Sequence, residues 1–487
     1  MASQGRGAGA DTLRSLTVRQ RQLAALYRGE GLTPVTGESP RVAVVGAGLA
    51  GLTAAHVLAA GGCALTLYEA SGRVGGRIRS ERGRCDPRAV WELGGEFIDS
   101  DHEEMHALAA VFDIGMLDTL PPSEDTFATA YRFGGQAYSE AQVEAAFAEI
   151  APRIATDLTS ISARPGYRAP SEADRRFDRL SIAEYLDGLT LDRWLHELIE
   201  VAYVTVYGLD PGEQSALNLL MLIGTGTARG FGLFGHSDER YKIRAGSQQL
   251  TDALARGLGA RIAFERRLVR LRRSANDWVL SFDGGAEARA DAVILALPFT
   301  LLRQVDLGDL LPPAKRLAVN TLGYGTNSKL MLGTRRRVWR EQGFNGGSYT
   351  DGALQTSWDC SRLRGGAGGV FTVFLGGRLG VALGDGDEAA QAAHHAMLAE
   401  AIFPGLGADC TGEARRIHWP SEPFALGAYA CYRPGQWTAF GGAEAEPLPG
   451  GLYFAGEHCA GTSQGYMNGA AETGRKAALA ILYGLTK

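Results

Sequence analysis

A glycine-rich turn near the start of the chain has the residue types and spacing of a phosphate-binding site. Gly46, Gly48 and Gly51 form a GxGxxG pattern between an apolar, β-branched segment (residues 41–45) and an alanine-rich segment. A strand, a turn and a helix in this order direct backbone N–H groups and the positive end of a helix dipole at a phosphate. Glu69 ends the next apolar segment, where a carboxylate binds ribose hydroxyls. These residues predict a site for a dinucleotide with an unphosphorylated ribose.

The elements that must position this turn form a β-α-β unit. Apolar patterning predicts strands at 41–45 and 64–68, with a helix at 49–60 between them. A further apolar run, residues 292–297, is typical of a strand buried on both faces. Further strands are predicted at 261–272, 278–282, 328–334, 369–376 and 424–432. Helices are predicted at 12–28, at 469–482 and over most of 101–240. Within the last stretch, loops are predicted at 162–172 and 224–236. This order predicts an α/β fold.

Length, composition and charge restrict the class of protein. The chain has 487 residues, of which 45% are hydrophobic and 21% charged, as in globular proteins of several domains. A net charge of −5 argues against nucleic acid or an anionic membrane as the partner. No apolar run approaches the ~18 residues of a membrane span, and we expect a cytoplasmic protein. The cysteines lack metal-site spacing, and residues 101–106 predict a helix start, so we expect no metal.

A pair of glycines flanked by arginines follows Glu69. Arg73 and Arg77 bracket Gly75 and Gly76; arginine suits a pyrophosphate, and the glycines admit close backbone contact. This run resembles the RxGGR signature of the flavin amine oxidase superfamily, which includes monoamine and polyamine oxidases and L-amino acid oxidases. The resemblance implies FAD as the cofactor.

Three further segments extend the resemblance over roughly residues 41–487. Residues 91–96 resemble the family segment beside the flavin ring, 241–250 a strand-to-helix segment, and 451–470 the closing FAD motif. The residues that the turn and the resemblance assign to FAD are Gly46, Gly48, Ala50, Gly51, Glu69, Ala70, Arg73, Gly76, Arg77, Gly94, Gly95, Glu96, Val269, Gly456, Glu457, Gly465, Tyr466 and Met467. Val269 matches a backbone contact to adenine. Because Ala428 stands where animal monoamine oxidases attach FAD through cysteine, we expect noncovalent FAD.

The resemblance also implies how the chain is divided. It predicts a Rossmann-like FAD-binding domain of the glutathione-reductase type, with an inserted mixed α+β substrate domain that has a helical part. The FAD-binding domain takes residues 41–100, 240–320 and 445–487, the substrate domain takes 101–239 and 321–444, and residues 1–40 form an N-terminal helix and linker. Relatives often dimerise, which suggests a homodimer.

The superfamily oxidises a C–N bond, and three residues match its reactive centre. Lys329 enters an apolar strand like the family lysine that holds a water near flavin N5. Tyr466 and Tyr429 match the two rings that flank the amine in monoamine oxidases; ordinary core tyrosines are the alternative. Trp419 lies where relatives carry an active-site or packing tryptophan, and both roles stay open. These four residues are the catalytic candidates.

The residues near the substrate leave its class open. Phe97 stands where venom-type L-amino acid oxidases have the arginine that binds the substrate carboxylate. Glu96 is expected either to accept the cation of a basic substrate or to bind nearby backbone, and Tyr349 and Trp358 either line the cavity or belong to the core.

Residues 94–102 resemble bacterial L-amino acid oxidases. We therefore predict an FAD-dependent oxidase of L-amino acids that yields a 2-oxo acid, ammonia and H2O2, by hydride transfer from the α-carbon to flavin N5 with O2 as acceptor. The alternative is an amine or polyamine oxidase whose substrates lack a carboxylate. A desaturase-type enzyme and a flavin-binding protein without activity fit the sequence less well.

Overall fold

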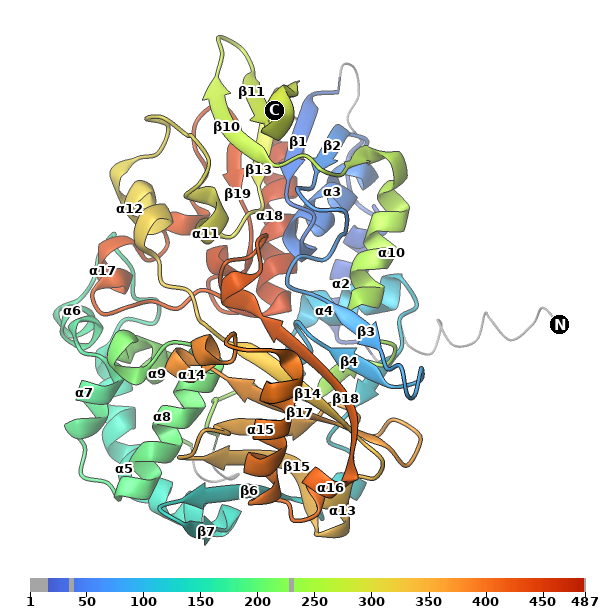
Figure 1. Cartoon of the computed structure of the whole chain (residues 1–487). Coiled ribbons are helices and arrows are strands. Elements are labelled where there is room, and N and C mark those ends of the chain that lie inside the picture. Colours follow the sequence, from blue (N-terminus) through green and yellow to red (C-terminus); the bar gives the residue numbers. More distant parts are fainter. Residues whose placement is uncertain (1–15, 35–38, 227–231, 486–487) are drawn as a thin grey trace.

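A parallel five-stranded sheet forms one half of the computed structural model, which describes residues 16–34, 39–226 and 232–485. The strand order is β19-β13-β1-β2-β9 (Figure 1). These strands are β1 (Arg41–Val45), β2 (Ala64–Tyr68), β9 (Ile262–Ala263), β13 (Ala292–Leu295) and β19 (Leu452–Phe454). Each neighbouring pair is parallel. The predicted α/β fold with a Rossmann-like sheet is confirmed.

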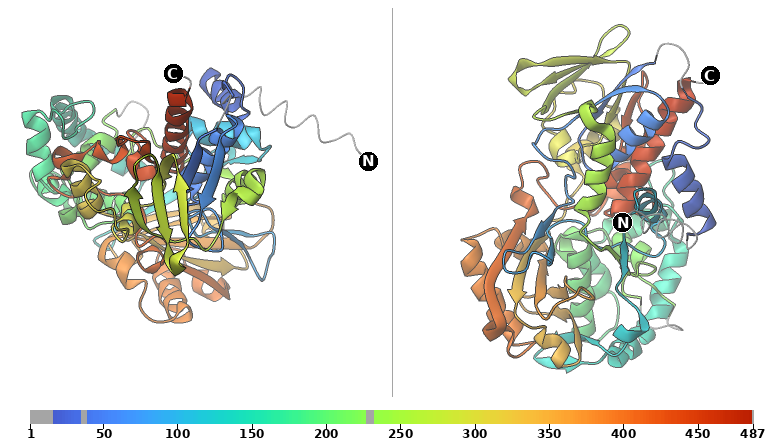
Figure 2. Two further views of the ribbon diagram at one scale, coloured as in Figure 1. Left: turned by 90° about the horizontal axis from the view of Figure 1, so that it is seen from above. Right: turned by 90° about the vertical axis from the view of Figure 1, so that its right-hand side faces the viewer.

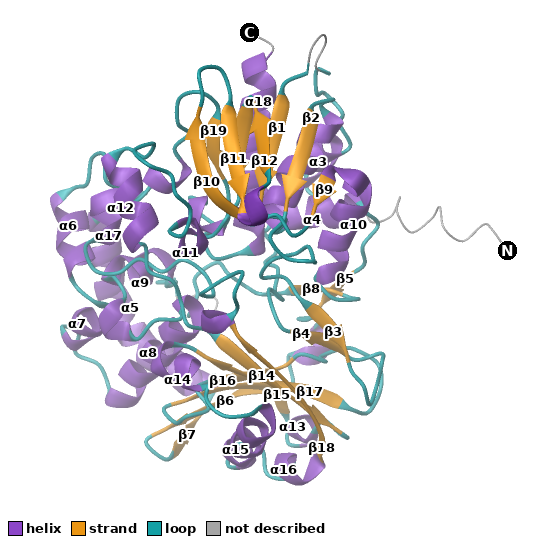
Figure 3. Cartoon of the chain, turned by 45° about the horizontal axis from the view of Figure 1, so that its top comes forward, coloured by secondary structure: helices purple, strands orange, loops and turns teal. Residues whose placement is uncertain are grey.

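Both faces of this sheet are covered, which explains its continuous apolar strands. Val42 and Val44 of β1 face a core shared with three helices, while Ala43 and Val45 face a core shared with a second sheet. The helices are α3 (Leu49–Ala60), α10 (Gln248–Leu258) and α18 (Met467–Leu485), and the second sheet is β10 (Leu268–Arg273), β11 (Trp278–Phe282) and β12 (Glu287–Ala290) (Figure 3). The sheet is thus the middle layer of three.

A seven-stranded sheet forms the other half, in the order β18-β14-β17-β16-β15-β6-β7. Its strands are β6 (Ala128–Phe133), β7 (Gln136–Tyr138), β14 (Ser328–Thr334), β15 (Phe344–Thr350), β16 (Thr356–Asp359), β17 (Gly369–Leu375) and β18 (Cys410–His418). The strand predicted at 424–432 is wrong, because the backbone there pairs with the 323–325 loop: Ala428 N–H donates to Gly325 and Cys431 N–H to Gly323. Strands β6 and β18 were not predicted.

Helices cover both faces of the seven-stranded sheet (Figure 2). On one side lie α5 (Glu140–Ser160), α6 (Glu172–Arg179), α7 (Ile182–Asp187), α8 (Arg193–Tyr207) and α9 (Ala216–Leu222). On the other lie α13 (Val338–Glu341), α14 (Gly377–Ala382), α15 (Glu388–Glu400) and α16 (Leu406–Asp409). Ser139, Ser171 and Ser181 start α5, α6 and α7 with capping boxes. No described helix is long and apolar enough to cross a membrane.

The N-terminal helix α2 (Val18–Tyr27) is packed into the first half of the molecule. Tyr27 is buried, and its hydroxyl donates to Glu104 of α4 (Glu103–Val111). Arg475 of α18 donates to the same carboxylate at 2.6 Å. This network joins helices from the two ends of the chain. Part of the predicted helix, residues 12–15, lies outside the described residues.

Short elements connect the two halves. They are β3 (Ser80–Arg82), β4 (Val90–Glu92), β5 (Met116–Asp118), β8 (Tyr241–Ile243), α11 (Phe299–Leu302), α12 (Pro313–Thr321) and α17 (Gln436–Phe440). Strand β4 is followed directly by the segment at Gly94, and β8 is bridged to Ile98 through Tyr241. The domain boundaries stay a prediction, but the connecting strands define where the two halves meet.

Candidate active site

One cavity of about 1920 Å³ extends from the first turn of the five-stranded sheet to the seven-stranded sheet. Its lining includes Gly46 and Glu69 at one end and Tyr349 and Trp358 at the other. Pockets for a single small ligand measure roughly 300–1,000 Å³. The cavity therefore has room for a dinucleotide and a substrate together.

The glycine turn forms an open cradle at the first end of the cavity. Gly46 has φ +101°, and a Cβ on Gly51 would collide with the Gly46 carbonyl oxygen. A Cβ on Gly48 would meet nothing within 4 Å. Gly48 is also the N-cap of α3 and supplies no side chain to its free N–H groups. These features fit a phosphate group.

Glu69 lies beside this cradle and is held in place by the backbone. Its Oε2 accepts the Ala47 N–H at 2.7 Å, and its Oε1 accepts the Ser71 N–H at 2.8 Å. Ala70 lines the cavity next to it. Arg73 also lines the cavity, but its guanidinium donates to carbonyls of the following turn, including Val74 at 3.2 Å. Arg73 thus braces the turn that carries Gly76.

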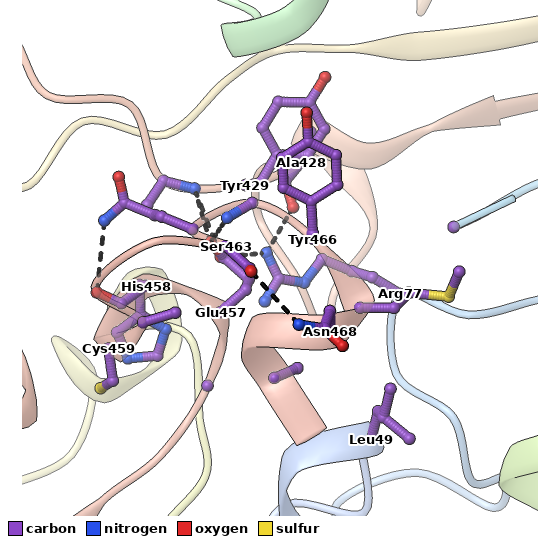
Figure 4. Close-up of a pocket in the computed structure, with 18 of the residues that line it drawn as sticks. Leu49, Arg77, Ala428, Tyr429, Glu457, His458, Cys459, Ser463, Tyr466 and Asn468 are labelled. Atoms are coloured by element: carbon purple, nitrogen blue, oxygen red, sulfur yellow. Dashed lines mark hydrogen bonds and ion pairs between the residues drawn. The ribbon is translucent and has the colours of Figure 1, made fainter. Parts of the chain in front are cut away.

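Glu457 joins separate segments of the cavity wall (Figure 4). Its carboxylate accepts Arg77 Nη1 at 2.8 Å and the Gly465 N–H at 3.0 Å. Met467 begins α18 and touches Gly95, where a Cβ would lie 2.9 Å from the methionine sulfur. All these residues line the cavity, as do Gly94 and Gly456. Strands and loops distant in sequence therefore meet around the expected flavin.

His458 is a cavity residue that the sequence analysis missed. Its ring is buried beside Phe299, with centroids 4.4 Å apart, and neither ring nitrogen has a partner among the described residues. Burial lowers its pKa to about 3, so the ring is neutral. Orphaned polar atoms in a cavity fit a polar group of FAD. Val269 is not in the lining; its neighbour Leu268 is, and the Val269 carbonyl accepts the Asp306 N–H.

Lys329 of β14 is fully engaged at the junction of the two halves. Its Nζ donates to the carbonyls of Glu92 at 2.9 Å and Gly94 at 2.8 Å, and to Glu96 Oε2 at 3.1 Å. A charged lysine in an all-buried strand requires such partners. The lysine thereby fixes the segment that the resemblance places beside the flavin.

Glu96 is shared by two buried lysines. Lys242 of β8 donates to its Oε1 at 2.7 Å, and the Trp358 indole N–H donates to its Oε2 at 3.1 Å. The two lysines lower the pKa of Glu96 to about 2 against the opposing effect of burial. Each oxygen of Glu96 thus accepts a lysine, and among the described residues no backbone group donates to its carboxylate. The sequence analysis missed Lys242.

The aromatic candidates line the inner part of the cavity. The Tyr429 hydroxyl donates to the Thr205 carbonyl at 3.0 Å, and the Tyr466 hydroxyl to Ser237 Oγ at 3.1 Å. Their rings rise from the loop after Ala428 and from the residue before α18 (Figure 4). Both hydroxyls are engaged by protein groups, and the Tyr466 ring also meets His102 with centroids 5.0 Å apart.

The other predicted aromatic residues also lie in this lining, and each packs on a neighbour. Tyr349 stacks on Tyr131 at 5.7 Å, and Trp358 meets Phe97 edge-on at 5.4 Å. Trp419 is buried in the core around Ala428 and also lines the cavity, so both of its expected roles are compatible with its position.

Glu239 is a second acidic cavity residue, and the sequence analysis missed it. Its backbone N–H donates to Asp99 Oδ1 at 2.9 Å, and its φ is +45°. No described residue donates a hydrogen bond to its carboxylate. Burial, with Asp99 and Glu96 nearby, raises the pKa of Glu239 to about 7.

Comparison with known proteins identifies the family of this fold and cavity. The model of the flavin containing amine oxidoreductases matches residues 49–482. An L-amino acid dehydrogenase from Synechocystis sp. is 25% identical, covering 90% of this chain and 94% of the relative. An amine oxidase [flavin-containing] from Danio rerio is 24% identical, covering 93% and 88%. The structure of cyclohexylamine oxidase from Brevibacterium oxydans IH-35A superimposes with TM-score 0.82 at 21% identity, covering 92% and 100%.

Proposed function

We propose that this chain, which belongs to the flavin containing amine oxidoreductase family, oxidises a primary amine at the carbon that carries the nitrogen. FAD, the cofactor of this family, accepts a hydride when it is bound. The observation that carries the proposal is one shared cavity wall. Lys329 holds the carbonyls of Glu92 and Gly94, while Tyr429 and Tyr466 line the same cavity.

The residues of this wall have separate tasks in the proposed reaction. Lys329 fixes the backbone beside the flavin, so the reacting carbon is presented at a constant position. The rings of Tyr429 and Tyr466 exclude water and offer π faces to an amine. Their hydroxyls are engaged elsewhere and need not move. The chain thus supplies orientation and a dry site.

The charges in the inner cavity favour substrates without a carboxylate. Phe97 stands where venom-type L-amino acid oxidases have their carboxylate-binding arginine, and it contributes no charge. Arg362, a cation of the lining, is paired with Glu124 at 2.8 Å. Glu239 adds an acid that repels a substrate carboxylate. An amine oxidase is therefore the function we favour.

L-Amino acids are the second candidate, which the sequence analysis favoured. Lys242 and Lys329 share the carboxylate of Glu96, so one carboxylate pairs with two lysines, an excess of positive charge whenever Glu239 is protonated. That excess would attract a substrate carboxylate. The L-amino acid dehydrogenase among the relatives also supports it. The products would be a 2-oxo acid and ammonia, with H2O2 if O2 is the electron acceptor.

Anaerobic mixing with paired ligands tests the proposal. The purified yellow holoprotein is mixed with phenethylamine or L-phenylalanine, and with agmatine or L-arginine, while flavin absorbance is followed. We expect bleaching by the amines. Bleaching by the acids alone would establish the second candidate, and no bleaching by any ligand would refute amine oxidation for these classes. Admitting O2 and measuring H2O2 then tests the electron acceptor.

A further inference from the structure

We propose that the Glu239 carboxylate binds the ammonium group of the substrate and takes its proton, so that a neutral amine is presented for oxidation. This inference rests on the proposed function and adds a binding and proton-accepting residue to it. The N–H bond of the ammonium breaks and an O–H bond forms on Glu239. No electrons are exchanged in this step.

The position of Glu239 is set by the junction of the two halves. Its segment runs beside residues 96–101: Tyr241 N–H and Ile98 N–H each donate to the other's carbonyl at 2.8 Å. Two residues before Glu239, Ser237 accepts the Tyr466 hydroxyl. Three residues after it, Lys242 holds Glu96. Glu239 therefore lies between the tyrosine rings and the lysine-bound carboxylate.

The backbone at Glu239 has an uncommon conformation. A φ of +45° lies in the left-handed region, which disfavours residues with a side chain. Asp99 holds this conformation by accepting the Glu239 N–H at 2.9 Å. A glycine would relieve the strain, yet the position carries a carboxylate that lines the cavity. Strain of this kind is concentrated at functional sites.

The Glu239 carboxylate differs from the three glutamates described above in this cavity. Glu69, Glu96 and Glu457 each accept at least two hydrogen bonds from protein groups. Within the described residues, none donates to the side chain of Glu239. Glu239 is half-buried, and a ligand that fills the cavity would withdraw its carboxylate from water, so that the carboxylate then needs a donor or a proton. A substrate ammonium supplies both.

The groups around Glu239 suit a proton acceptor. The ionisable groups that act on it or respond to it are Asp99, Glu96, Lys242, Lys329, Tyr349, Tyr429 and Tyr466. Burial and the two acids raise its pKa to about 7, and the lysines oppose them. The lysines also disfavour another cation nearby and so lower the pKa of a bound amine. Both effects bring the pKa of Glu239 and the pKa of the bound amine closer together, as efficient proton transfer requires.

Binding and pH dependence test this role with matched variants. Glu239→Gln keeps the shape and removes the charge. Asp238→Asn is the control, because Asp238 belongs to the same loop and binds the exposed Ser100. The probes are benzyltrimethylammonium, a permanent cation, and neopentylbenzene, its neutral isostere, titrated by flavin difference spectra. We expect Glu239→Gln to weaken binding of the cation at least tenfold and to leave the affinity for the neutral probe unchanged.

The rate of anaerobic flavin reduction by phenethylamine supplies the second readout. In the wild type we expect the rate to rise through pH 7 as Glu239 ionises. In Glu239→Gln we expect a roughly 10²-fold loss at pH 7 and recovery at high pH, where the amine is itself neutral. Equal cation affinity and equal pH profiles in the two proteins would overturn the inference. A wild type that no amine reduces would instead overturn the proposed function.

Discussion

The substitution Glu96→Gln tests how the junction of the two halves is stabilised. Glu96 is buried between Lys242 and Lys329, whose side chains are 2% and 6% exposed. Glutamine preserves the shape but leaves two buried cations without their carboxylate. We expect the variant to be less stable by several kcal/mol.

The magnitude follows from the pKa of Glu96. Lowering it from 4.5 to about 2 corresponds to about 3 kcal/mol, at roughly 1.4 kcal/mol per pH unit. Breaking a buried ion pair by removing one partner costs roughly 3–5 kcal/mol, which agrees. Because the folded state lowers this pKa, the contribution is fully present above about pH 4.5 and is lost as the pH falls toward 2.

Urea unfolding followed by tryptophan fluorescence measures the effect in the holoprotein at pH 7 and at pH 3. We expect the difference between wild type and Glu96→Gln to be smaller at pH 3. Glu197→Gln is the control, since its partner Arg193 is 92% exposed and the pair contributes about 0.5 kcal/mol or less. Adding Lys242→Met to Glu96→Gln removes one of the two buried cations that have lost their carboxylate partner, and it should restore part of the stability. A loss below about 1 kcal/mol, or no restoration by the double variant, would refute this reasoning.

Further predictions concern the reactive wall and the N-terminal helix. Lys329→Met should slow anaerobic flavin reduction by at least about 10²-fold while FAD content stays unchanged; a rate near wild type would contradict its positioning role. Tyr429→Phe and Tyr466→Phe should each slow reduction by less than about tenfold, because only an outward hydrogen bond is lost; stopped-flow absorbance measures both. Arg475→Met should destabilise the fold by roughly 3–5 kcal/mol and Tyr27→Phe by about 1 kcal/mol. Limited proteolysis should then release α2 faster from both variants than from the wild type. An unchanged rate of cleavage would show that Tyr27 and Arg475 do not hold α2 in place.

Local patterns predicted the nucleotide-binding unit well because its signals lie close together in the sequence. The predicted strands at 41–45 and 64–68 and the helix at 49–60 have the bounds of β1, β2 and α3. The strand predicted at 424–432 failed because that backbone pairs with a distant loop. Strand β6 was missed although it forms a local hairpin with β7 across Gly134 and Gly135, because the stretch 101–240 was predicted to be mostly helical.

The same contrast holds for the site. Glu69 and Lys329 stand in segments whose pattern assigns them a role, whereas Glu239 lies outside every matched segment, and the segments matched around Lys242 and His458 assign those two residues no role. Charged residues in the stretch 238–244 have the composition of a solvated surface segment. Only the tertiary packing of this stretch against residues 96–101 makes it an inner wall. In the short strand β8 both Lys242 and Ile243 are buried, so no alternation of apolar and polar residues marked Lys242 as an inner residue.

The position of β19 at the edge of the five-stranded sheet has a consequence for biosynthesis. β13 pairs with β19 on one side, and α18 follows β19 and covers β1. At about 5–20 residues per second, the ribosome reaches β19 roughly 20 to 80 seconds after it has begun β1. Until then the nascent chain exposes one apolar sheet edge and lacks Glu457 and Met467. The lining of the cavity is therefore complete only after this segment has been synthesised.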